Sequence, residues 1–70
     1  MHWNYRVVKT VVNGEVGYAI HEAYYDDGSE PTSITEKPAT IYAESLEGLR
    51  QELELMTKAL DITIIEDPDL

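Results

Sequence analysis

The first third of this chain decides its fold. Residues 3–25 read WNYRVVKTVVNGEVGYAIHEAYY. Two runs rich in β-branched and aromatic side chains flank Asn13-Gly14, a dipeptide that tolerates positive φ at both positions and therefore favours a two-residue type I′ turn. The sequence predicts a β-hairpin with strands over residues 3–12 and 15–25.

A two-residue turn fixes the register of this hairpin, so Val12 pairs with Glu15 and Val7 pairs with Ile20. One face then carries large apolar side chains, and we expect it to be the core side. Its members are Trp3, Tyr5, Val7, Val11, Val16, Tyr18, Ile20 and Tyr24, interrupted by Lys9 and Glu22.

The opposite face of the hairpin is lighter and more polar. Because one helix covers only one side of a sheet, we expect this lighter face to meet solvent or a second copy of the chain. The candidate partner or dimer face comprises Arg6, Val8, Ala19, His21, Ala23 and Tyr25.

Beyond the hairpin, residues 26–29 form a turn signal, and residues 32–35 have enough β-branched character for a third, shorter strand. Lys37-Pro38 interrupts this strand, since proline cannot donate to a ladder. Residues 39–44 either resume the strand or form an irregular approach to the next element.

A helix is predicted after Ser45, a suitable N-cap, and it ends near Leu60. Its apolar residues recur at intervals of three and four and are expected to cover the sheet: Leu46, Leu49, Leu53, Met56 and Leu60. Residues 62–65 form a short apolar run that could be a fourth strand. Residues 66–70 form an acidic end, expected to be a flexible tail.

These elements predict an α+β fold of the βββαβ type. The hairpin and third strand form an antiparallel three-stranded meander, one helix packs on one face, and a fourth strand lies parallel to the first, in the order 3-2-1-4. No linker or repeat divides residues 1–70, so we expect one small domain.

Charge and cysteine content limit the kinds of partner and the cellular compartment that we expect. The 70 residues carry five Lys and Arg, fourteen Asp and Glu, a net charge of −9 and no cysteine. Such a charge repels nucleic acid and anionic membrane, so a partner recruited by electrostatics should be basic. Without cysteine, and with no apolar run of membrane-spanning length or signal peptide, a cytoplasmic protein is expected.

No catalytic or cofactor pattern is found. His21 and Glu22 are neighbours in a strand and point to opposite faces, which prevents them from acting together as acid and base. The four glycines are scattered and form no phosphate loop, and two histidines without cysteine recommend no metal site. The expectation is a protein with no enzymatic activity, no cofactor and no metal.

Carboxylates crowd the predicted helix and its flanks. The candidate acidic docking surface comprises Glu44, Glu47, Glu52, Glu54 and Asp61. It could be a solvated helix face that maintains solubility, with Glu54 and Lys58 as a supporting pair. Alternatively, it could attract a basic protein, or imitate the phosphate spacing of DNA and block a nucleic-acid enzyme.

Residues 43–53, AESLEGLRQEL, follow a hairpin and a third strand, an order that resembles the HicB-like antitoxin domain. The resemblance implies a truncated ribonuclease-H-like fold without nuclease activity, often dimeric, that neutralises a small basic ribonuclease. The YRVV and YAIHE segments, at residues 5–8 and 18–22, also resemble short acidic bacterial proteins of uncharacterised function.

The leading hypothesis is therefore a small acidic protein–protein interaction module, expected to be a homodimer, that acts as an antitoxin-like inhibitor of a small basic ribonuclease. A nucleic-acid mimic or anti-restriction type inhibitor is the second hypothesis. A structural or regulatory protein without catalytic activity is the third.

Overall fold

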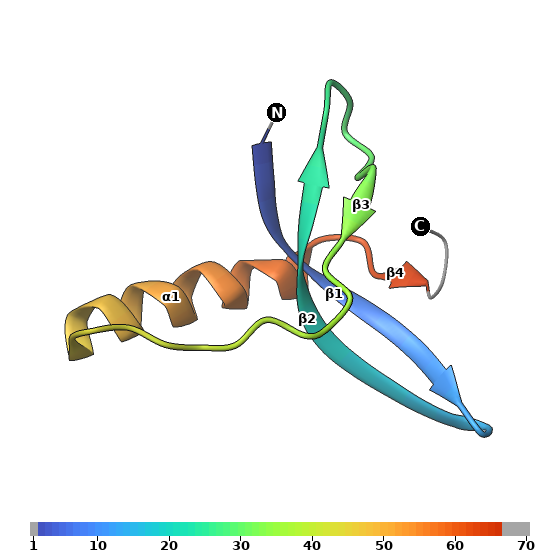
Figure 1. Cartoon of the computed structure of the whole chain (residues 1–70), viewed down its shortest axis with the longest axis horizontal. Helices are drawn as coiled ribbons and strands as arrows, with labels where there is room; N and C mark the ends of the chain where they lie inside the picture. Colours follow the sequence, from blue (N-terminus) through green and yellow to red (C-terminus); the bar gives the residue numbers. More distant parts are fainter. Residues whose placement is uncertain (1, 67–70) are drawn as a thin grey trace.

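A long, curled β-hairpin forms the centre of the molecule in the computed structural model, which describes residues 2–66 (Figure 1). The elements, in chain order, are β1 (His2–Val12), β2 (Glu15–Tyr25), β3 (Ser33–Ile34), α1 (Leu46–Lys58), the 3₁₀ turn η1 (Ala59–Asp61) and β4 (Ile65–Glu66). They form a mixed four-stranded sheet in the order β3-β2-β1-β4, with β4 parallel to β1. The predicted α+β class and strand order agree with this arrangement.

The turn of the hairpin has the predicted geometry. Asn13 has φ 53° and Gly14 has φ 80°, the two positive values that a type I′ turn requires. The antiparallel register matches the prediction from Val12↔Glu15 through Val7↔Ile20 to Trp3↔Tyr24. Turn length alone was enough to place every cross-strand pair.

The predicted three-stranded meander is not confirmed, because β3 contributes only two residues. Around it the chain follows the edge of β2 through isolated backbone bonds: the amides of Thr32, Thr35 and Ala39 donate to carbonyls of β2 at 2.8, 3.0 and 2.8 Å. Residues 39–44 do not resume the strand and form an irregular approach to α1. Residues 67–70, most of the predicted flexible tail, lie outside the described part of the chain.

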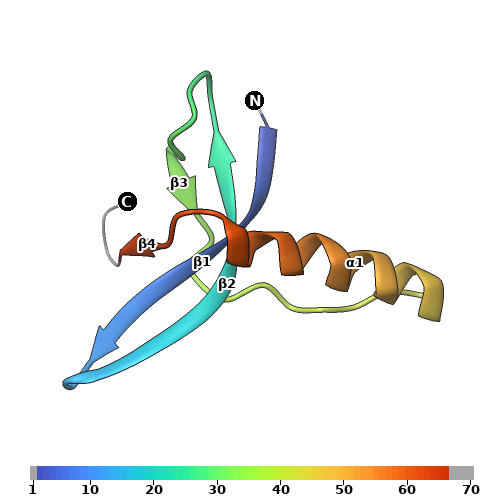
Figure 2. The same cartoon turned by 180° about the vertical axis from the view of Figure 1, so that it is seen from behind.

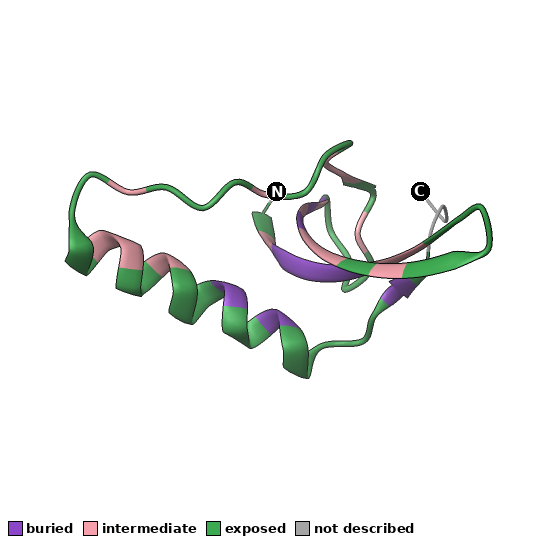
Figure 3. Ribbon diagram, turned by 90° about the horizontal axis from the view of Figure 1, so that it is seen from below, coloured by how far each residue is buried: buried purple, intermediate pink, exposed green. Residues whose placement is uncertain are grey.

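Helix α1 begins as predicted. The Ser45 side chain accepts a hydrogen bond from the Gly48 amide at 3.0 Å, which caps the first turn. The helix crosses the hairpin only with its C-terminal turns and projects beyond the sheet (Figure 2). Figure 3 shows buried helix residues at the end nearest the sheet.

This placement corrects the predicted packing of the helix. Of the five apolar residues expected to cover the sheet, only Met56 is buried and Leu49 is half-buried. Met56 and Ala59 pack against Tyr5 and Val7, with Ile20 and Ala39 at the margin. The N-terminal turns of α1 have no sheet beneath them, so Leu46 stays exposed. Leu53 and Leu60 are exposed as well, although Leu60 lies in η1 beside the buried Ala59.

The sheet curls away from the helix, so its two sides differ. We call the side that α1 touches the outer side and the opposite, concave side the inner side. The inner side is enclosed by the segments before β3 and around β4, which line the same cavity although they belong to opposite edges of the sheet. Its central residues are more completely buried than those under the helix.

Candidate functional site

The lighter face of the hairpin is this inner side. The exposure expected for it is wrong: Arg6, Val8, His21, Ala23 and Tyr25 are all buried, and Ala19 is half-buried. Ala23 has no accessible surface and Val8 has 1%. The curl of the sheet brings the chain's own later segments over this face, so solvent or a second copy is not needed to cover it.

Arg6 joins the inner side to the segment after the helix. Its Nη1 donates to the Tyr25 hydroxyl at 2.9 Å, and that hydroxyl donates in turn to Asn4 Oδ1 at 2.9 Å. Its Nη2 donates to the backbone carbonyl of Thr63. These bonds explain how an arginine with only 6% of its surface accessible is tolerated between two strands.

His21, directly across from Arg6, joins the inner side to the other edge of the sheet. Its Nδ1 lies 2.9 Å from the Thr35 carbonyl oxygen. Because a carbonyl only accepts hydrogen bonds, Nδ1 must carry the proton. Arg6 therefore holds the segment after the helix through Thr63, and His21 holds the chain just after β3 through Thr35.

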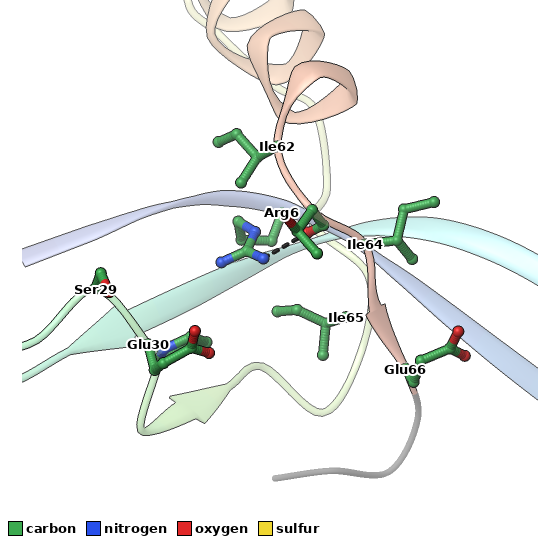
Figure 4. A pocket seen from close by; sticks show the side chains of 9 residues that line it. Arg6, Ser29, Glu30, Ile62, Ile64, Ile65 and Glu66 are labelled. Atoms are coloured by element: carbon green, nitrogen blue, oxygen red, sulfur yellow. Dashed lines mark hydrogen bonds between the residues drawn. The ribbon is translucent and has the colours of Figure 1, made fainter.

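A cavity of about 300 Å³ opens beside Arg6 (Figure 4). It is lined from one edge by Ser29, Glu30 and Pro31 and from the other by Ile62, Thr63, Ile64, Ile65 and Glu66. Within residues 2–66, Arg6 Nε has no hydrogen-bond partner and no carboxylate lies within ion-pair distance of the guanidinium.

A buried guanidinium with a free donor is a feature of carboxylate and phosphate sites. Here, however, the carboxylates of Glu30 and Glu66 also line the cavity and would repel an entering anion. Two of the three guanidinium nitrogens are already bound to Tyr25 and Thr63. The arrangement supports a structural role for Arg6.

The five predicted acidic residues do not form one surface. Glu52 faces the sheet, and its carboxylate accepts a hydrogen bond of 2.6 Å from the Tyr5 hydroxyl. This bond, together with burial and the negative charge of Glu52, raises the pKa of Tyr5 to about 12. Glu52 therefore packs against the sheet and does not belong to the candidate acidic docking surface.

The remaining four carboxylates are exposed, and we call them the acidic stripe: Glu44, Glu47, Glu54 and Asp61. Glu47 and Glu54 are seven residues apart, which places them on one side of α1 about 10.5 Å from each other. Among the described residues, the one ion pair of this stripe joins Glu47 to Arg50 Nε at 3.8 Å, and both side chains are 72% exposed. The predicted Glu54–Lys58 ion pair is not formed in the described structure.

Sequence reasoning missed two exposed apolar patches. The leucine stripe, Leu46, Leu53 and Leu60, is 85, 50 and 69% exposed on one side of the helical segment. The hairpin-tip patch, Val11, Val16 and Tyr18, is 57, 53 and 63% exposed on the outer side of the sheet. The seven-residue spacing of these leucines was visible in the sequence and was assigned to the core.

A second groove of about 410 Å³ runs between the start of β1 and the end of α1. Its lining is mostly apolar: Trp3, Asn4, Tyr5, Leu55, Lys58, Ala59 and Ile62. Trp3 stacks edge-on against Tyr5 with ring centres 5.2 Å apart, which fixes one wall. The groove contains no paired acid and base, and its surface is mostly apolar.

Metal-binding clusters and membrane-spanning helices are not seen in the described residues. Residues 2–66 contain no cluster of three or more His, Cys, Asp or Glu side chains able to hold a metal ion. In the same range, no helix has the length and apolar character needed to cross a membrane. No protein-family model, curated protein or solved structure matches the chain.

Proposed function

We propose that this chain is a non-catalytic binding protein whose acidic stripe docks a small basic protein, as an antitoxin-like inhibitor of a basic ribonuclease would. The projection of α1 beyond the sheet is the observation that supports this function. Glu47 and Glu54 are exposed there, and within residues 2–66 the only ion pair of either carboxylate is the loose one between Glu47 and Arg50 of the same helix.

Negative charge lets the acidic stripe attract a basic protein over a distance. With a net charge of −9, the whole chain attracts a basic protein, and the regularly spaced carboxylates of a helix direct it to one side. The same carboxylates contribute little to folding, because exposed ion pairs are worth about 0–1 kcal/mol. Their removal should therefore change binding without changing the fold.

The test compares three immobilised baits in a lysate of the native cell: the wild-type chain, the Glu47→Lys/Glu54→Lys double variant and the Asp26→Lys/Asp27→Lys double variant. The last pair lies in an exposed loop and changes net charge by the same amount. Retained proteins are identified by mass at low and high salt. A recovered basic protein is then assayed for RNA cleavage with and without the chain.

We expect a small basic protein on the wild-type and loop-variant baits at low salt, lost from the helix variant and lost at high salt. RNA cleavage by that protein should fall when the chain is added. Equal retention by the helix variant would overturn the assignment to the acidic stripe. Release of the partner by duplex DNA would instead favour the nucleic-acid mimic.

A further inference from the structure

The chain exposes more surface than a monomer of its size should. Its accessible surface is 5373 Å². A folded monomer of 7.9 kDa is expected to expose about 4,400 Å². The radius of gyration, 12.8 Å, likewise exceeds the roughly 11 Å typical of 70 residues. The excess is comparable with the roughly 800 Å² that each partner buries in a standard protein interface.

Much of the exposed apolar surface lies in two patches, one on the helix layer and one on the side of the sheet that the helix touches. The leucine stripe is the unpacked part of the helix layer, and the hairpin-tip patch is the unpacked part of the sheet's outer side. Within one chain, α1 points away from the hairpin tip, so the two patches cannot meet (Figures 1 and 2).

The two patches also match in length. Three leucines spaced by seven residues extend over about 21 Å of helix. From Val7, where the helix contact ends, to Val12, β1 extends about 17 Å. A helix laid on this part of the hairpin would therefore cover it from the existing core to the turn.

We infer that the leucine stripe of one chain packs on the hairpin-tip patch of a second copy, and that the contact is reciprocal. A two-fold axis makes each chain supply one helix and one hairpin tip, so a closed homodimer buries both patches twice. The helix of the second copy continues the layer that Met56 and Ala59 begin. This face replaces the inner side that the sequence predicted for a dimer.

The inferred interface is separate from the acidic stripe. Leu46 and Leu53 lie about 100° around the helix from Glu47 and Glu54, so a dimer leaves those carboxylates free. Dimerisation through the apolar patches and binding of a basic protein by the acidic stripe should also respond to salt in opposite directions. Two chains of charge −9 repel each other, so salt should strengthen the apolar dimer, whereas salt weakens binding of a basic protein.

The test measures the molar mass of the full chain by sedimentation equilibrium over a range of concentrations and salt. Three single variants are compared with the wild type: Leu53→Glu on the helix, Tyr18→Lys on the hairpin, and Leu55→Glu as the matched control. Leu55 is 46% exposed, close to the 50% of Leu53, but it faces the other side of α1. Circular dichroism verifies that each variant is folded.

We expect a wild-type dimer that tightens with salt. Leu53→Glu and Tyr18→Lys should each weaken dimerisation by about a hundredfold or more, because a charge would be buried without a partner. Leu55→Glu should remain dimeric. An equimolar mixture of Leu53→Glu and Tyr18→Lys should recover a heterodimer. In that heterodimer the introduced carboxylate meets the introduced ammonium group in one contact, and the other contact keeps its native side chains.

Three results would overturn the inference. The first is a wild-type chain that stays monomeric at every concentration and salt. The second is dissociation by Leu53→Glu but not by Tyr18→Lys, which would show helix-to-helix pairing instead. The third is equal weakening by the Leu55→Glu control. None of these results bears on the acidic stripe, so the proposed function stands or falls by its own test.

Discussion

On the inner side of the curled sheet Val8, Ala23 and Tyr25 are almost fully enclosed, whereas on the outer side Val11, Val16 and Tyr18 are more than half exposed. The two sides belong to the same pair of strands. Small side chains such as Ala23 let the inner side become concave, and the covering segments can then approach closely. In a narrow, strongly curled sheet, a face of light residues can therefore be the better-buried one.

The largest expected effect comes from opening the inner side. Val8→Ala removes two methyl groups from a site with 1% exposure and should lower the free energy of unfolding by about 2 kcal/mol. Val12→Ala, on the same strand but 63% exposed, should change it by less than about 0.5 kcal/mol. Urea unfolding measures both. Equal effects would refute the difference in enclosure along this face.

The outer side is secured by a hydrogen bond as well as by packing. Tyr5→Phe removes the donor to Glu52 and should cost about 1.5 kcal/mol at neutral pH, since the acceptor is charged. Urea unfolding at pH 7 measures this loss, and an unchanged midpoint would show that the bond adds nothing to stability. Because the substituted ring has no hydroxyl, the variant also isolates the titration described next.

The same contact predicts a loss of stability in alkali. The pKa of Tyr5 is about 12 when folded and close to 10 when unfolded, so its contribution is complete below pH 10 and is lost as pH rises from 10 to 12. Unfolding measured from pH 8 to pH 12 should show a decline that is smaller in Tyr5→Phe. Parallel curves for the two proteins would contradict the assignment.

The projecting end of α1 depends on its own cap, because no sheet supports it. Ser45→Ala leaves the Gly48 amide without its acceptor and should cost about 1 kcal/mol. Helical circular dichroism during urea unfolding reports the change. Ser29→Ala, in an exposed loop and without a capping bond, serves as the control. If Ser45→Ala leaves the urea unfolding curve unchanged, other contacts hold this end of the helix.

The smallest effect is expected at the exposed surface of the helix. Glu47→Gln removes the 3.8 Å contact with Arg50 and should change the free energy of unfolding by less than about 0.5 kcal/mol. Thermal unfolding at low and high salt measures it. A loss above about 1 kcal/mol would show that this carboxylate is part of the folding core and unsuitable as a binding probe.

Local signals predicted the hairpin and the start of the helix, but not the bounds of the short strands β3 and β4, which have two residues each. Asn13-Gly14 determined the hairpin and its register, and Ser45 determined the start of the helix. The curl was not predictable from local sequence, because it depends on how the segments around Arg6 and His21 meet across the inner side. The leucines were misassigned for a related reason: their spacing shows that they share a side of the helix, but not what that side faces.

The parallel pairing of β4 with β1 joins Val8 to Ile65, near opposite ends of the described chain. During synthesis, the hairpin emerges about forty residues before the segment that completes its inner side, a delay of a few seconds at ribosomal speed. Throughout that interval β1 presents an open edge rich in valine, where strands of neighbouring nascent chains can add. Rapid overexpression should therefore favour inclusion bodies, because more nascent hairpins with an open β1 edge are present at the same time.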